Sequence, residues 1–351
     1  MAPIRVLVVD DSALVRQIVT HVLSEANRIE VVATARNGVE AITAVRQLRP
    51  DVVTLDIQMP EMDGIEALKH IVRESTARVV MLSSLDDPEI TFKALECGAV
   101  DFIVKPRAGL ASSVDSLSAD LVRAVRTAYA ISPDKRLAAP PAASPSSIIE
   151  CLPGDPRQLV CIASSTGGPL ALDRVFAGLR SDAPAAYLVV QHLPSGFSHS
   201  FAARLARQGG FPVMEAVNGL RLSAGCGYVA PWGSHMRVHG SPGAPTTIEL
   251  FDGPNLHGLK PSADPLFESA AEAYGPATVG VVLTGMGSDG AIGMAAIREA
   301  GGMTIAQDEA SSVVWGMPGA AVRLGAAQTV APIDRVAVEI RRSLRGSEAR
   351  S

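Results

Sequence analysis

The sequence predicts an α/β protein of two doubly wound domains with parallel sheets, and three observations support this. Short apolar runs alternate with amphipathic helical segments from residue 4 to residue 129, and again from residue 158 to residue 306. Between these regions, residues 131–157 hold prolines spread among alanine and serine without periodicity, which is typical of an extended linker. The 351 residues, 47% of them hydrophobic, are enough to build two cores.

In the first region, five strands are expected to alternate with five helices, which favours a parallel sheet with helical crossovers. Ser12 is available as N-cap of the first helix. The expected strands are 4–9, 30–35, 52–55, 79–82 and 101–104, and the expected helices are 13–23, 39–48, 65–72, 89–95 and 117–129.

Chemically complementary side chains follow these strands where they end. They are Asp10, Asp11, Asp56, Ser83 and Lys105. Ligands of such sheets bind at the carboxyl ends of the strands. Clustered carboxylates repel one another unless a cation joins them, and oxygen ligands favour Mg²⁺. A carboxylate nucleophile, a metal, a lysine and a hydroxyl together indicate phosphoryl transfer, whereas isolated acidic residues here would be solvated turn residues.

The second region shows the same βα rhythm, with one antiparallel strand expected at 248–251. The other expected strands are 159–163, 186–190, 212–217, 227–230, 278–283 and 303–306, and the expected helices are 169–179, 201–206, 263–273 and 291–300. Three of these strands are followed by Ser165, His192 and Asp289. Serine, imidazole and carboxylate at one sheet edge are the components of an acyl-transfer triad. From spacing alone, an N-cap serine and a structural histidine remain equally open.

A rival interpretation of the same loop is a nucleotide site. Gly285, Gly287 and Gly290 fit the pattern G-x-G-x-x-G between a strand and a helix, with Asp308 about 20 residues after the loop begins. Asp289 within the turn argues against it, because its charge would repel a pyrophosphate.

Composition excludes several classes of function. The net charge is −5 and no dense Lys/Arg run is present, which argues against nucleic-acid binding. No apolar run approaches the roughly 18 residues of a membrane span, and Asp10 and Asp11 interrupt the only apolar run near the N-terminus, so no signal peptide is expected. The four cysteines, Cys97, Cys151, Cys161 and Cys226, lack metal-like spacing and are expected to be free thiols in a reducing cytoplasm.

The motifs VLVVDDS, DVVTLDIQMPEMDG, VVMLSS and DFIVKP resemble a two-component response-regulator receiver domain of flavodoxin-like fold. This resemblance implies that Asp56 accepts a phosphoryl group from a histidine kinase. It also implies that Asp10, Asp11, Asp56 and the backbone carbonyl of Gln58 hold Mg²⁺. Ser83 and Lys105 would sense the phosphoryl group, and the bond from Lys105 to Pro106 would be cis.

The motifs ASSTGG, VVQHLP, YVAPWGSH, HGLKPSADPLF and VVLTGMGSDGAIGM resemble the Rossmann-like catalytic domain of the chemotaxis protein-glutamate methylesterases. The resemblance implies hydrolysis of glutamyl methyl esters on chemoreceptor cytoplasmic helices, and deamidation of receptor glutamines. It implies Ser165 as nucleophile, His192 as base and Asp289 as orienting acid, with Thr166 and the Met286 backbone beside the oxyanion. This chain has Ala163 and Ser164 where the family usually has Gly-Ala.

These observations predict a receiver domain at 1–130, a linker at 131–157 and a methylesterase domain at 158–346, acting in the cytoplasm without cofactor in the esterase domain. One alternative is a signalling adaptor whose second domain binds a partner without turnover. A second is a transcriptional regulator, which the absence of a basic helix disfavours.

Overall fold

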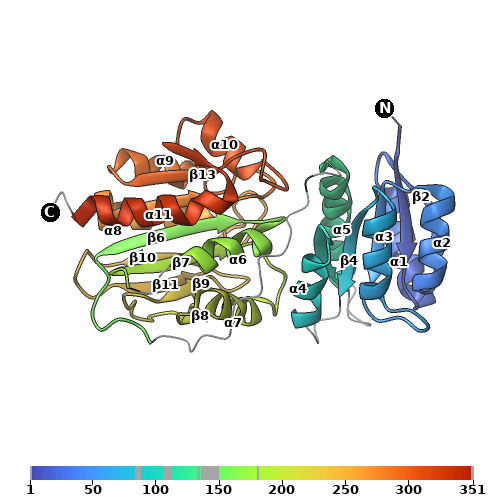
Figure 1. Ribbon diagram of the computed structural model, residues 1–351, viewed down its shortest axis with the longest axis horizontal. Coiled ribbons are helices and arrows are strands. Elements are labelled where there is room, and N and C mark those ends of the chain that lie inside the picture. The colour runs from blue at the N-terminus through green and yellow to red at the C-terminus, as the bar shows by residue number, and fades with distance from the viewer. Residues whose placement is uncertain are drawn as a thin grey trace. The chain divides into compact units, whose positions relative to one another are not determined.

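The structure is a computed structural model that describes residues 2–83, 88–105, 112–132, 135, 150–179 and 182–348, without the side chains of 112–117 and 346–348 (Figure 1). The chain divides into two compact units, Met1–Ala139 and Pro140–Ser351, and each is described by itself. Pro106 lies outside the described residues, and so does most of the proline-rich segment.

The first unit is a five-stranded sheet in the order β2-β1-β3-β4-β5, and every printed strand pair in it is parallel. Its strands are β1 (Ile4–Val9), β2 (Ile29–Ala35), β3 (Val52–Asp56), β4 (Arg78–Ser83) and β5 (Asp101–Val104). Its helices are α1 (Ala13–Glu25), α2 (Gly38–Leu48), α3 (Gly64–Glu74), α4 (Pro88–Glu96) and α5 (Ser112–Ala130). The five expected strands and helices are all present, within a few residues of their expected ends.

Local chemistry explains where α1, α2 and α3 begin. Ser12, Asn37 and Asp63 each accept a hydrogen bond from a main-chain N–H in the first turn of the helix that follows. β3 lies in the middle of the sheet and is buried along its whole length, because helices cover both of its faces. Its last residue, Asp56, is therefore held rigidly at the carboxyl end of this central strand.

The second unit is a seven-stranded sheet in the order β14-β13-β12-β6-β7-β9-β8, also parallel in its printed pairs, with a separate two-stranded sheet. The strands are β6 (Gln158–Ser164), β7 (Ala185–Gln191), β8 (Val213–Glu215), β9 (Gly227–Val229), β10 (His235–His239), β11 (Thr247–Phe251), β12 (Thr278–Val282), β13 (Met303–Gln307) and β14 (Thr329–Ala331). The helices are α6 (Gly168–Gly178), α7 (Ser198–Gly209), α8 (Ala263–Tyr274), α9 (Ala291–Glu299), α10 (Met317–Arg323) and α11 (Ile333–Glu348), with a 3-10 turn at Gly275–Ala277.

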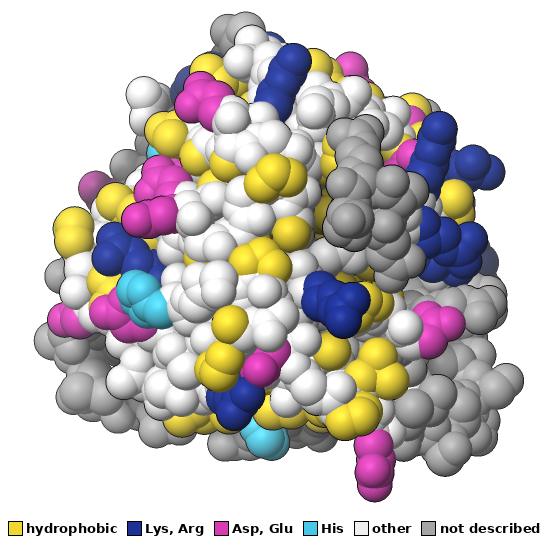
Figure 2. Space-filling view, turned by 90° about the vertical axis from the view of Figure 1, so that its left-hand side faces the viewer, with side chains coloured by type: hydrophobic (Ala, Val, Ile, Leu, Met, Phe, Trp, Pro, Cys, Tyr) yellow, Lys and Arg dark blue, Asp and Glu magenta, His cyan; other side chains and the backbone are white. Residues whose placement is uncertain are grey.

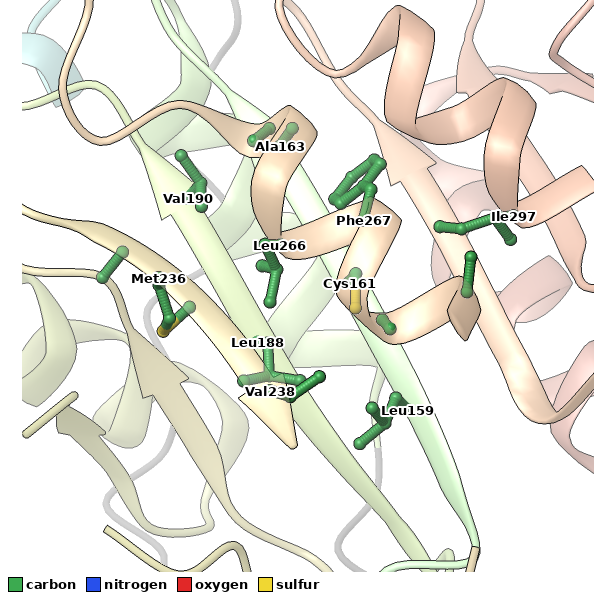
Figure 3. Close-up of a cluster of buried hydrophobic side chains, with 14 of the residues drawn as sticks. Leu159, Cys161, Ala163, Leu188, Val190, Met236, Val238, Leu266, Phe267 and Ile297 are labelled. Atoms are coloured by element: carbon green, nitrogen blue, oxygen red, sulfur yellow. The ribbon is translucent and has the colours of Figure 1, made fainter. Parts of the chain in front are cut away.

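Helices cover both faces of this sheet, so the predicted fold class is confirmed for both units. Phe176 of α6 packs against Tyr187 of β7 on one face, where α6 also contacts α7 and α11. On the other face, alternate residues of β6 and β7 form a core with α8, α9 and β10, which includes Leu159, Leu188 and Phe267 (Figure 3). This alternation places successive strand residues on opposite sides and fixes the strand ends in space.

The antiparallel strand expected at 248–251 is confirmed, since β11 pairs antiparallel with β10. Besides the 3-10 turn, four of the described elements were not expected from the sequence: β10, α10, β14 and α11. β10 carries polar residues at alternate positions, because the hairpin lies on α8 rather than within the main sheet.

The expectation of four free thiols is wrong for two of the cysteines. Cys151 and Cys226 form a disulfide, while Cys97 and Cys161 are free. Their Cα atoms lie 5.4 Å apart because the chain before β6 runs beside the loop that leads into β9, where Leu152 N–H bonds to the Ala224 carbonyl. This contact joins residues 75 positions apart, and spacing in the sequence does not reveal it.

On the face shown in Figure 2, charged side chains of both signs are interspersed with apolar and neutral ones. Among the described helices, none combines the length and the apolar character needed to cross a membrane.

Candidate active site

Three neighbouring strands of the second sheet bring the residues of the expected triad to one edge. β6 ends directly before Ser165, and β7 beside it ends directly before His192. Asp289 lies in the loop that follows β12, the neighbour of β6 on its other side. The ring of His192 meets the carboxylate of Asp289, with Nε2 2.8 Å from Oδ2.

The Asp289 carboxylate is buried and accepts three hydrogen bonds. Besides the His192 ring, the Ser262 hydroxyl donates to Oδ1 at 2.5 Å and the Ala263 main-chain N–H donates to Oδ2 at 2.8 Å. Burial by itself raises the pKa of this carboxyl, but the hydrogen bonds and the charge of His192 outweigh it, and the pKa lies below its ordinary value. Asp289 is therefore ionised at neutral pH and can only accept hydrogen bonds.

This fixes the proton on the imidazole of His192. An ionised carboxylate cannot donate, so the proton between the two groups belongs to Nε2 of the neutral ring. The other nitrogen, Nδ1, then carries the lone pair; it is buried, and within the described part of the chain it has no hydrogen-bond partner. A neutral histidine with a bare, shielded nitrogen is suited to take a proton from a hydroxyl.

Ser165 lies in the tight turn between β6 and α6. Its main-chain N–H donates to the Thr284 carbonyl at 3.0 Å, and its carbonyl accepts from Gly168 N–H at 2.7 Å. Gly167, with φ of 77°, makes the turn into the helix. Gly285 has to be a glycine, because a Cβ there would lie 2.8 Å from the Cβ of Ser165.

The two adjacent serines differ in environment. Ser164 is the last residue of β6 and is completely buried, with its hydroxyl donating to Gln191 Oε1 at 2.6 Å. Ser165 is partly exposed. The methyl group of Ala163, which the family pattern lacks, belongs to the buried core of Figure 3 and does not enter the turn.

Of the two residues expected beside the oxyanion, Thr166 is buried and its carbonyl accepts from the Thr284 hydroxyl at 3.0 Å. Met286 follows Gly285, and 44% of it is exposed. Thr166 follows Ser165 in the chain, and Met286 follows Gly285, where a Cβ would lie 2.8 Å from the Cβ of Ser165. The oxyanion role of both residues stays a prediction.

Sequence reasoning missed Ser262 and the amide of Ala263, which hold Asp289 from a segment 26 and 27 residues away. Behind them, Ser262 N–H donates to Nδ1 of the buried His235, whose Nε2 lies 3.0 Å from the Pro254 carbonyl. The motif HGLKPSADPLF contains the segment, but nothing in its residue types pointed to the loop after β12.

The expected receiver residues also converge at one sheet edge. The ammonium group of Lys105 lies 2.8 Å from Asp10 Oδ2 and 2.7 Å from Asp56 Oδ1. Carboxylate oxygens of Asp10, Asp11 and Asp56 lie within 4.8 Å of one another. A cavity of about 200 Å³ opens here, lined by Asp11, Asp56, Ile57, Gln58, Ser83, Ile90 and Lys105.

The charges at this edge suit a divalent cation. Burial raises the pKa of Asp56 to about 6, although the hydrogen bond and charge of Lys105 oppose the shift. The ligand atoms that Asp10, Asp11 and Asp56 offer are all carboxylate oxygens, which Mg²⁺ prefers. The Ser83 hydroxyl lies 2.6 Å from the Thr91 hydroxyl, and Gln58 N–H donates to Asp56 Oδ1 at 3.4 Å.

Comparisons with known proteins find similar proteins for both units of the chain. The family model described as CheB methylesterase matches residues 160–340, and the model for the response regulator receiver domain matches residues 6–113. A protein-glutamate methylesterase/protein-glutamine glutaminase of Symbiobacterium thermophilum is 44% identical over 97% of this chain and 97% of its own. One of Xanthomonas campestris pv. campestris is 43% identical over 95% of this chain and 96% of its own. The crystal structure of the Thermotoga maritima CheB methylesterase catalytic domain superposes with a TM-score of 0.51, at 34% identity, covering 54% of this chain and 97% of that one.

Proposed function

The chain belongs to the CheB methylesterase family and carries a receiver domain before the esterase domain, and on this premise we propose which residues perform and control its reaction. The enzyme hydrolyses glutamyl methyl esters of chemoreceptors to glutamate and methanol, and deamidates receptor glutamines. We assign residues 1–130 to the receiver, 131–157 to the linker and 158–346 to the methylesterase domain.

Acylation begins at Ser165. Its Oγ attacks the ester carbonyl carbon while Nδ1 of His192 takes the hydroxyl proton. Asp289 keeps the imidazole in the required tautomer and stabilises the imidazolium that forms. The tetrahedral intermediate collapses when the imidazolium gives its proton to the methoxy oxygen, so methanol leaves and a glutamyl ester of Ser165 remains.

Deacylation repeats these steps with water. Nδ1 of His192 takes a proton from water, the hydroxide adds to the acyl carbon, and Ser165 leaves as a hydroxyl after reprotonation. In deamidation the leaving group is ammonia, and the acyl-enzyme is the same. The negative oxygen of each intermediate is stabilised by main-chain N–H groups beside Thr166 and Met286, at the N-terminus of α6 and the loop after β12.

The observation that carries this proposal is the contact between His192 Nε2 and Asp289 Oδ2, from which the tautomer of His192 is inferred. A buried aspartate with lowered pKa accepts from Nε2 at 2.8 Å and leaves a bare, shielded Nδ1 at the edge where Ser165 emerges. The alternative is an adaptor whose second domain binds a partner without turnover. That function would not need an ionised aspartate bonded to a histidine, so this contact favours the enzyme.

Methanol release from methylated receptor membranes tests it. Ser165→Ala should reduce the rate by about 10³-fold or more, because the covalent path is lost. The matched control is Ser198→Ala, which also removes a hydroxyl bonded at 2.6 Å to a side-chain oxygen, that of Glu215, and should stay within about twofold of wild type. Substantial activity of Ser165→Ala would refute the assignment of the nucleophile.

In the receiver, we propose that Asp56 accepts the phosphoryl group from a histidine kinase. Asp10, Asp11, Asp56 and the carbonyl of Gln58 would hold Mg²⁺, which when bound neutralises the carboxylates and the incoming phosphoryl oxygens. Lys105 would exchange its contact with the Asp56 carboxylate for one with the phosphoryl group. Ser83 would turn its hydroxyl from Thr91 toward the same group.

We propose that the reaction is regulated by the receiver, which inhibits the esterase domain when Asp56 is unphosphorylated. We place the reaction in the cytoplasm, where the chemoreceptor helices that carry the methyl esters lie. A tethered domain has an effective concentration on the order of millimolar, so a weak contact suffices. A small-molecule phosphodonor with Mg²⁺ should activate the full-length enzyme and leave Asp56→Asn unchanged. Equal activation of that variant would exclude Asp56 as the acceptor.

A further inference from the structure

We propose that Ser164 and Gln191 are positioning residues for the esterase reaction. The Ser164 hydroxyl orients the side-chain amide of Gln191, and that amide holds the two strand ends that carry Ser165 and His192. The inference rests on the proposed roles of Ser165 and His192, and it concerns their immediate neighbours in the chain.

Ser164 and Gln191 are the last register pair of β6 and β7, and both are buried. The Ser164 hydroxyl donates to Gln191 Oε1 at 2.6 Å. Gln191 Nε2 donates to the main-chain carbonyls of Ser165 and His192, each at 3.0 Å. One side chain therefore bridges the residue after β6 and the residue after β7.

The hydrogen bonds determine which way the Gln191 amide points. Its NH₂ group has two protons and meets two carbonyl oxygens, which can only accept. The reverse orientation would bring Oε1 within 3.0 Å of both carbonyls and leave the three oxygens without a proton between them. The Ser164 hydroxyl supplies the remaining bond of this amide. Among the hydrogen bonds described for Gln191, it is the one that donates to Oε1.

Packing leaves the amide little freedom to move. A Cβ on Gly168, in the first turn of α6, would lie 2.0 Å from Gln191 Oε1 and 2.9 Å from Ser164 Oγ. The side-chain pair therefore fills the space under the helix start, and the Ser165 carbonyl receives a second bond there from Gly168 N–H at 2.7 Å.

This position matters because the ladder of main-chain bonds ends here. The N–H of His192 donates to the Ser164 carbonyl at 3.2 Å, and beyond that bond the two strands leave the sheet. Gln191 supplies the next connection, directly behind the serine and histidine that exchange a proton. Since a misplacement of about 1 Å can cost about 100-fold in rate, loosening this connection should slow the chemical step.

The substrate does not reach these buried groups, so their loss should lower kcat and leave KM unchanged. Ser164→Ala, which restores the family's usual residue, should lower kcat about three- to tenfold. Gln191→Met, which removes every bond of the amide at similar volume, should lower it about ten- to hundredfold, that is, about 1.4 kcal/mol for each factor of ten. In Gln191→Glu, one carboxylate oxygen can still accept from the Ser164 hydroxyl, but the other lies against two carbonyl oxygens. This variant should therefore lower kcat more than Ser164→Ala.

A double-mutant cycle of methanol release by the full-length phosphorylated enzyme tests the inference. Ser164→Ala should have no further effect on kcat in the Gln191→Met background, because the hydroxyl acts through the amide. Additive effects, a wild-type kcat for Ser164→Ala, or a change in KM alone would overturn the proposal. If Gln191→Met does not fold, the cycle is run with Gln191→Leu, which also removes every bond of the amide, and the Ser198→Ala control should remain within about twofold of wild type.

The proposal and the assignment of the nucleophile can fail separately. If Ser165→Ala retains activity, the proposed mechanism fails whatever the cycle gives. If Ser165→Ala is inactive and both Ser164→Ala and Gln191→Met equal the wild type, only the positioning role fails.

Discussion

Replacement of Asp289 by asparagine separates the two contributions to catalysis that we propose for this residue, its charge and the tautomer it enforces. Oδ2 accepts from both His192 Nε2–H and the Ala263 main-chain N–H, whereas Oδ1 accepts from the Ser262 hydroxyl. A main-chain N–H can neither turn away nor accept a bond. The asparagine oxygen should therefore take the place of Oδ2, with its NH₂ group facing the Ser262 hydroxyl, which can accept.

In that orientation the asparagine still accepts from Nε2–H, so His192 keeps the tautomer with a bare Nδ1. Only the charge is lost. A hydrogen bond to a charged group contributes about 1.5–3 kcal/mol and a neutral one about 0.5–1.5 kcal/mol. The transition state, which carries the imidazolium, should lose about 1–1.5 kcal/mol, or about five- to thirteenfold in kcat. The loss is about 10⁴-fold in enzymes where the same replacement leaves histidine in the wrong tautomer.

Methanol release measured against pH checks this. The variant should retain about 8–20% of the wild-type kcat, and the acid limb of its pH profile should move to lower pH, because an uncharged partner no longer favours the imidazolium. Ser262→Ala keeps the charge and should cost less than Asp289→Asn. A folded Asp289→Asn enzyme that loses about 10⁴-fold or more would refute the orientation by Ala263 N–H.

Three further predictions concern control and stability. Burial holds the pKa of Asp56 at about 6 in the folded receiver against an unfolded value of 3.8, so the folded state binds the proton more tightly. Asp56→Asn should therefore unfold at a temperature higher by about 4 °C or more at neutral pH, and the difference should shrink as pH falls from about 6 toward 4; a constant difference would contradict the raised pKa. Deleting residues 1 to about 140 should raise basal esterase activity and abolish activation by a phosphodonor. If the truncated enzyme were less active than the unphosphorylated full-length enzyme, inhibition by the receiver would be excluded. Thiol titration of the denatured, unreduced protein should find two free thiols and four after reduction, because Cys151 and Cys226 are paired; four before reduction would exclude the pair.

The alternation of apolar runs and amphipathic helices predicted both sheets because each βα unit buries its strand locally. The residues after the strands could also be grouped from the sequence, because the carboxyl ends of parallel strands lie along one side of the sheet. For this reason Ser165, His192 and Asp289 were expected together, although Ser165 and Asp289 are 124 residues apart in the chain. The choice between Ser164 and Ser165 depended on motif resemblance. The structure supplies the physical reason, since a residue inside the strand is buried and the next one enters the turn.

Contacts that join distant segments could not be predicted in this way. Ser262 and Ala263 lie at the start of α8, and their bonds to Asp289 depend on how α8 packs beside the loop after β12. The strand β10 escaped prediction for a related reason, because its apolar residues face α8 and not a neighbouring βα unit. The disulfide depends in the same way on where the chain runs before β6.

The glycine-rich loop after β12 shows how one sequence pattern can serve two kinds of site. In a dinucleotide site the glycines let a pyrophosphate approach the backbone at a helix start. Here Gly285 makes room for Ser165, and the loop carries its own buried anion, Asp289, which three donors already satisfy. Asp308, the acid that would bind a ribose, instead accepts from the N–H and hydroxyl of Ser311. The charge inside the turn, and not the spacing of the glycines, therefore decides that this loop orients a histidine.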